Sequence, residues 1–84
     1  MTAPRPNPPA GMAVRLTAAL GAIATPDSAV FLPDVLIWPG HEGVYMHQRA
    51  DGWHIVRVTL APHHEVFVPC MRRHFEVVEV QPWD

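Results

Sequence analysis

The pattern of hydrophobic and polar positions divides the chain near residue 30. From there on, apolar residues occur in short runs separated by proline and glycine, which is typical of β-strands joined by tight turns. The predicted strands cover residues 30–38 (interrupted by Pro33), 43–49, 53–60, 65–68 and 75–80. Asp51–Gly52 predicts a two-residue hairpin turn with positive φ at both positions, a register that places Tyr45 opposite Val58.

The first 25 residues follow a different pattern. Met12, Leu16, Leu20 and Ile23 recur at near-helical spacing, so a short amphipathic helix is expected over residues 12–25. Because such a short helix is marginal alone, it needs a surface to pack on. Four prolines in residues 1–11 predict an extended arm, and residues 81–84 form a C-terminal tail.

The fold class expected from this pattern is mainly β. Five to six short antiparallel strands over residues 30–80 predict a small barrel, because closure leaves no sheet edge open. Val58, Phe67, Trp53 and Phe75 are its expected core residues.

Composition and charge restrict the classes of partner. The chain has 84 residues, enough for one domain, and it has six arginines but no lysine. Residues 1–26 carry +2 and residues 27–84 carry −4, which sum to the net charge of −2. An acidic strand region disfavours nucleic acid and favours a protein partner. The sequence has no run of ~18 apolar residues to span a membrane, and its single cysteine excludes an internal disulfide, so we expect a cytoplasmic protein.

No motif for catalysis, a cofactor or a metal occurs. The histidines lack zinc-ligand spacing and are expected on the surface and in turns, where they could make an interaction pH-sensitive. Cys70 precedes Arg72, Arg73 and His74, which would favour a thiolate, but no group is in place to orient it. We therefore expect a structural cysteine and a protein that is not an enzyme. The histidines are His41, His47, His54, His63, His64 and His74.

The strand region resembles the SH3-like barrel superfamily, especially its bacterial and KOW-like members, over about residues 33–80. The residues that carry this resemblance are Val35–Trp38, Pro39–Gly40, Gly43–Tyr45, Asp51–Gly52, Val56–Val58, Val66–Pro69 and Phe75–Val80. It implies a small barrel with aromatic grooves between its loops, and for the KOW-like members an association with RNA or DNA. The type B dihydrofolate reductases also use this barrel, with a V-Q-I-Y-P signature near the position of Val66–Pro69. The chain lacks that Gln and Tyr and has no lysine for the cofactor phosphate.

The sequence therefore predicts a non-enzymatic protein-binding or accessory module. It would be a small subunit, or a phage or bacterial interaction protein, that docks on a larger complex. A KOW-like nucleic-acid factor is the alternative, a dihydrofolate reductase-like barrel is a remote one, and self-association through the helix stays open. The residues expected to bind the partner are Trp38, Tyr45, Trp83, Arg72, Arg73 and His74.

Overall fold

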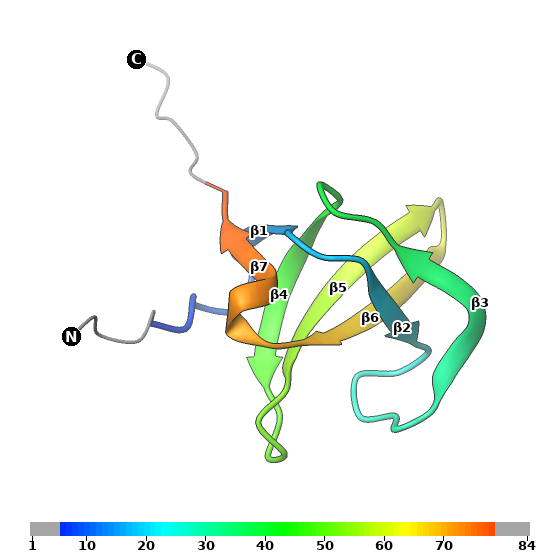
Figure 1. Ribbon diagram of the computed structural model, residues 1–84, viewed down its shortest axis with the longest axis horizontal. Helices are drawn as coiled ribbons and strands as arrows, with labels where there is room; N and C mark the ends of the chain where they lie inside the picture. Colours follow the sequence, from blue (N-terminus) through cyan, green and yellow to red (C-terminus); the bar gives the residue numbers. More distant parts are fainter. Residues whose placement is uncertain (1–5, 79–84) are drawn as a thin grey trace.

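A computed structural model of the chain describes residues 6–78. Seven strands and one 3₁₀ helix follow one another along these residues (Figure 1). They are β1 (Ala13–Leu16), β2 (Leu20–Ile23), β3 (Phe31–Ile37), β4 (Glu42–Gln48), β5 (His54–Ala61), β6 (His64–Cys70), η1 (Arg72–His74) and β7 (Phe75–Val77).

All seven strands belong to one antiparallel sheet with the order β3-β2-β6-β5-β4-β1-β7. The sheet coils strongly, with β3 and β7 at its two ends (Figure 1). Within residues 6–78 no strand pairing joins these ends, so the sheet is open where the sequence predicted a closed barrel. The edge at β3 is protected in another way: Pro33 lacks an N–H, and within the strand Asp34 takes a left-handed backbone conformation with φ of 61°.

The segment expected as a helix, residues 12–25, instead forms β1 and β2, and that prediction is wrong. Val14 and Leu16 point into the core from β1, as alternate residues of a strand do. The sequence therefore contained this two-residue spacing as well as the helical one. β1 lies between β4 and β7, and β2 lies between β3 and β6. The backbone N–H and C=O groups of β1 and β2 therefore form hydrogen bonds with strands that are mostly distant in the sequence. A helix of this length has no comparable source of stability.

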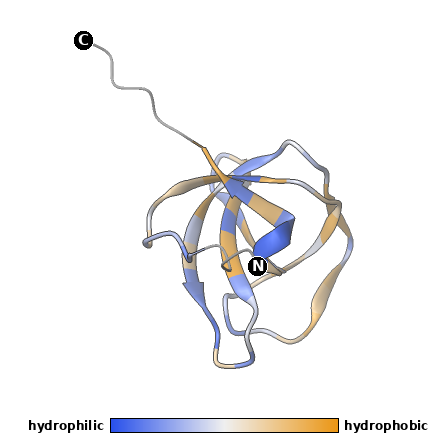
Figure 2. Ribbon diagram, turned by 60° about the vertical axis from the view of Figure 1, so that its left-hand side comes forward, coloured by the Kyte–Doolittle hydropathy of each residue, from blue (hydrophilic) through white to orange (hydrophobic). Residues whose placement is uncertain are grey.

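The core lies between the coiled strands. Hydrophobic and hydrophilic residues alternate along several of them (Figure 2). Val58 and Phe75 are buried as predicted, whereas Phe67 is half-buried and Trp53 is 40% exposed. The connected core comprises Val14, Leu16, Ala22, Ile37, Tyr45, Val56, Val58, Val66, Val68, Cys70 and Phe75.

The hairpin at Asp51–Gly52 is present, but its turn differs from the prediction. The Gly52 N–H donates to Arg49 O (2.9 Å) and the Arg49 N–H donates to Trp53 O (2.7 Å), which makes a three-residue loop. Only Gly52 takes positive φ in this loop (95°), so a type I′ turn is excluded. A bulge between Tyr45 and His47 then shifts the pairing, and Tyr45 lies opposite Val56.

Helical structure in the described residues is confined to η1, the single turn that follows β6. The following strand, predicted over residues 75–80, is β7, and residues 79–80 lie outside the described part. No helix within residues 6–78 has the length and apolar character that crossing a membrane requires.

Candidate functional site

A cavity of about 410 Å³ opens where the loop 24–30, the β4–β5 hairpin, β6 and η1 meet. We call it the aromatic groove. Its apolar walls are Leu20, Ile23, Phe31, Trp53 and Pro69, and its polar walls include Ser28, Arg49, Asp51 and His74. Two aromatic side chains of the groove face solvent, because Phe31 is 56% and Trp53 is 40% exposed.

Phe31 takes its position over β2 because that strand carries a glycine. A Cβ on Gly21 would lie 2.8 Å from Cδ1 of the Phe31 ring, which is closer than side-chain atoms approach one another. The ring therefore covers the bare backbone of Gly21, where the pairing of β2 and β3 is irregular. At this point the floor of the groove is formed by the Gly21 backbone and the aliphatic side chains of Leu20 and Ile23.

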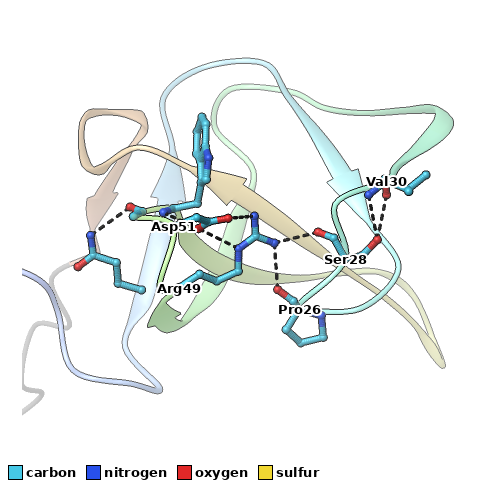
Figure 3. A network of polar contacts seen from close by, with 8 residues as sticks. Pro26, Ser28, Val30, Arg49 and Asp51 are labelled. Atoms are coloured by element: carbon cyan, nitrogen blue, oxygen red, sulfur yellow. Dashed lines mark hydrogen bonds and ion pairs between the residues drawn. The ribbon is translucent and has the colours of Figure 1, made fainter.

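Arg49 holds the polar wall together (Figure 3). Its Nη2 and Nε donate to the two carboxylate oxygens of Asp51 at 2.7 and 3.2 Å. Its Nη1 donates to the carbonyl oxygens of Ser28 (2.9 Å) and Pro26 (3.3 Å) in the loop between β2 and β3. One guanidinium therefore fixes the hairpin tip against this loop and sets the groove width.

The Asp51 carboxylate has a second structural function. Its Oδ1 accepts the Trp53 N–H at 3.2 Å, which orients the backbone of the exposed tryptophan. The hydrogen bond from Arg49 is the main cause that lowers the pKa of Asp51 below its usual range. The carboxylate thus stays charged at neutral pH and keeps half of its surface in water.

The structure separates the predicted partner-binding residues. Trp38 is 66% exposed after β3 but does not line the aromatic groove. Tyr45 is only 3% exposed, so its prediction as a surface anchor is wrong: it lies opposite the fully buried Val56, and its ring packs against His54 and Phe75 in the core. Trp83 lies outside the described residues.

The three predicted residues of η1 differ from one another. Arg73 is exposed, whereas His74 is half-buried and lines the groove. Its Nδ1 accepts the Met71 N–H at 3.2 Å. Arg72 lies across the ring of Phe75, with Cζ 4.6 Å from the ring centroid, and donates to the carbonyl oxygens of Pro6 and Phe75. Only His74 of this trio belongs to the groove.

Sequence reasoning missed Phe31, Arg49 and Asp51 and assigned Trp53 to the core. One signal was available, since Arg49 and Asp51 are opposite charges two residues apart in the turn that precedes Trp53. Phe31 gave none, because its contact with Gly21 depends on the pairing of β2 with β3.

Acid–base and metal chemistry have little support in the described part of the chain. Burial raises the pKa of the Cys70 thiol to about 12, and its Sγ donates to the His54 carbonyl oxygen at 3.7 Å. A thiol of this kind is no nucleophile at neutral pH. Among residues 6–78, no three His, Cys, Asp or Glu side chains lie close enough together to hold a metal ion.

Most arginines in residues 6–78 are already engaged in ion pairs or hydrogen bonds. Arg15 pairs with Glu76 (3.1 Å), Arg49 with Asp51 (2.7 Å) and Arg57 with Glu65 (3.9 Å), and Arg72 is bound as described above. This surface therefore offers phosphate groups little unpaired positive charge.

No family model matches the chain, and comparison with curated proteins and with solved structures found no match.

Proposed function

We propose that this chain is a non-enzymatic protein-binding module whose aromatic groove receives a segment of a partner protein. The observation that carries the proposal is the pair of exposed aromatic side chains, Phe31 and Trp53, on either side of an apolar cavity. Exposed tryptophan beside an apolar pocket is characteristic of binding hot spots. Isolated exposed apolar residues are common on protein surfaces, but a lined cavity between two of them supports binding.

The partner segment is apolar with a basic residue at one end. Its apolar side chains would pack on Leu20, Phe31 and Trp53 in the groove. An adjoining hollow is lined by Asp27 and Asp51, while the nearby Arg49 is occupied by hydrogen bonds. Arg49 and Asp51 neutralise each other, so the negative charge at this end comes from exposed Asp27, which favours a lysine or arginine on the partner.

An SH3-like architecture and a cytoplasmic location complete the proposal. The coiled antiparallel sheet and the short 3₁₀ turn before the last described strand support the first. The free, buried Cys70 supports the second, because it needs no oxidising compartment. Within this proposal the chain acts as a small accessory subunit of a larger bacterial or phage assembly. The nucleic-acid alternative has less support, since the described arginines are mostly engaged.

Site-specific photo-crosslinking tests the groove. Benzoylphenylalanine is incorporated in place of Phe31, of Trp38, or of Leu60, an exposed residue of β5 outside the groove, and each purified protein is irradiated in host lysate. We expect one discrete protein adduct from position 31, lost when Trp53→Ala is added, and none from position 60.

Three outcomes would contradict the proposal. Equal adducts from positions 31 and 60 would mean non-specific contact. An adduct from position 38 with none from position 31 would move the site to Trp38, the anchor expected from sequence. Recovery of nucleic acid in place of protein, together with binding of single- or double-stranded DNA or RNA at low salt, would favour the alternative function.

A further inference from the structure

Three aromatic rings contact one another beneath the strands β4, β5 and β7. The ring centroids of Tyr45 and His54 are 5.8 Å apart, and each lies 5.6 Å from that of Phe75. His54 is 4% exposed, and its Nδ1 shares a 2.9 Å hydrogen bond with the Tyr45 hydroxyl. A histidine is therefore enclosed in an aromatic cluster.

Arg72 covers this cluster from η1. Its guanidinium lies on the Phe75 ring, and its Nη1 donates to the Phe75 carbonyl oxygen at 2.9 Å. Its Nε donates to the Pro6 carbonyl oxygen at 3.2 Å. The same side chain thus packs on the rings and holds the N-terminal part of the described chain.

Residues 6–12, which we call the strap, lie against the body of the protein. Pro8 is buried, and the Asn7 amide donates to Gln48 Oε1 at 3.0 Å. Near its other end, the Gly11 N–H donates to Tyr45 O (2.8 Å) and the Tyr45 N–H donates to Met12 O (2.9 Å). The strap is therefore tied at one end to Arg72 and at the other to Tyr45, and both residues belong to the surroundings of His54.

The titratable groups around His54 come from three elements. β4 contributes the Tyr45 hydroxyl, β6 contributes the Cys70 thiol, and η1 contributes the Arg72 guanidinium, while Phe75 of β7 is uncharged. Burial, and secondly Arg72, lower the pKa of His54, and no carboxylate within residues 6–78 counters them. Burial likewise raises the pKa values of Tyr45 and Cys70, so both are neutral when His54 titrates.

We propose that the strap is an acid-operated latch, which opens when His54 takes up a proton. The hydrogen bond to Tyr45 survives this proton, because the hydroxyl can turn from donor to acceptor. The imidazolium charge, however, is buried with no acidic partner among residues 6–78, and it is repelled by the Arg72 guanidinium, which packs on the same Phe75 ring. The repulsion between the two charges is reduced most directly when Arg72 moves away from Phe75 into water. This movement breaks its hydrogen bond to the Pro6 carbonyl oxygen.

The direction of the pH effect on latch opening follows from the coupling between opening and proton binding at His54. In the closed latch His54 resists protonation, whereas in the open latch water reaches the ring and its pKa returns toward 6.5. The open form therefore binds the proton more tightly, and opening is favoured as pH falls below about 6.5. One proton changes the open-to-closed ratio by at most ~10-fold per pH unit.

NMR of the full 84-residue chain, labelled with ¹⁵N and ¹³C, tests the latch between about pH 8 and pH 5. The probes are the Arg72 Nε–H, the Asn7 side-chain amide and hydrogen-exchange protection of the Gly11 amide, with the Val56 and Val68 amides as reference for the folded core. We expect the strap signals to change with the same midpoint as the His54 ring, while the core amides stay protected. Titration of His54 with an unchanged strap, or loss of strap and core together, would overturn the proposal.

Matched variants separate His54 from the other histidines. His54→Gln keeps a hydrogen-bonding partner for Tyr45 but cannot titrate, so strap protection should be independent of pH. His47→Gln, an exposed change on β4, should behave as the wild type. If His54→Gln does not fold, Arg72→Gln serves in its place: it should free the Pro6 end of the strap at every pH and raise the pKa of His54. Persistence of the acid response in His54→Gln, or of a closed strap in Arg72→Gln, would refute the latch.

Discussion

Arg49 Nη2 lies 2.7 Å from Asp51 Oδ2, across the turn of the β4–β5 hairpin. The arginine side chain is 16% exposed, because the rest of its guanidinium is directed to the carbonyl oxygens of Pro26 and Ser28. This pair connects the hairpin tip to the loop before β3. It thereby places Trp53 and Phe31 on the same groove.

Replacement of Arg49 should loosen that loop. Arg49→Ala leaves two partly buried carbonyl oxygens without their donor, and we expect a loss of about 1–3 kcal/mol in the free energy of unfolding. Urea denaturation checks the value. Arg73→Ala, an exposed arginine, should stay within about 0.5 kcal/mol of wild type. Equal losses for the two variants would contradict the tethering of the loop by Arg49.

Gly43 should tolerate no side chain. A Cβ at this position would lie 2.6 Å from the Arg57 carbonyl oxygen and 2.7 Å from Val56 Cγ1, so β4 and β5 must separate. We expect Gly43→Ala to cost about 1–3 kcal/mol of stability, measured by thermal and urea unfolding. Gly21→Ala is the comparison, because there the obstacle is the ring of exposed Phe31, which can swing away. A smaller loss for Gly43→Ala than for Gly21→Ala would refute this packing.

The free energy of unfolding should fall with acid in two steps. The folded state depresses the pKa of His54, so its contribution is complete above about pH 6.5 and declines as pH falls through the folded-state pKa. The pKa of Asp51 is also depressed, and its contribution is lost below its usual value of 3.8. Urea unfolding at a series of pH values gives the profile. His54→Phe should remove the upper step and leave the lower; an unchanged upper step would show that another group causes it.

Cys70 should be inert in the folded protein. Its burial and a pKa of about 12 leave almost no accessible thiolate at pH 8, so iodoacetamide should modify it only after the sheet opens. The rate is measured by mass spectrometry with and without urea. Rapid modification of the native chain would contradict the packing of Cys70 beneath His54.

The sequence by itself determined most of the strand content after residue 30. Apolar runs bounded by proline and glycine located β4, β5 and β6, and the Asp51–Gly52 pair located the hairpin, because these signals are local. The secondary structure of the N-terminal segment, by contrast, was not determined by its local sequence. Residues 13–16 and 20–23 fit a helix as well as two strands, and the choice was made by backbone partners in β4, β6 and β7.

Tertiary structure alone decided which aromatic side chains face solvent. Tyr45 and Trp53 lie on the same hairpin, yet the first is enclosed in the core while the second remains on the surface. The observed register differs from the predicted one by two residues and keeps Tyr45 on the same face, so its burial depends on the rings of His54 and Phe75, the latter from distant β7. For the same reason the aromatic groove and the ring cluster around His54, both built from strands far apart in the chain, emerged only from the folded sheet.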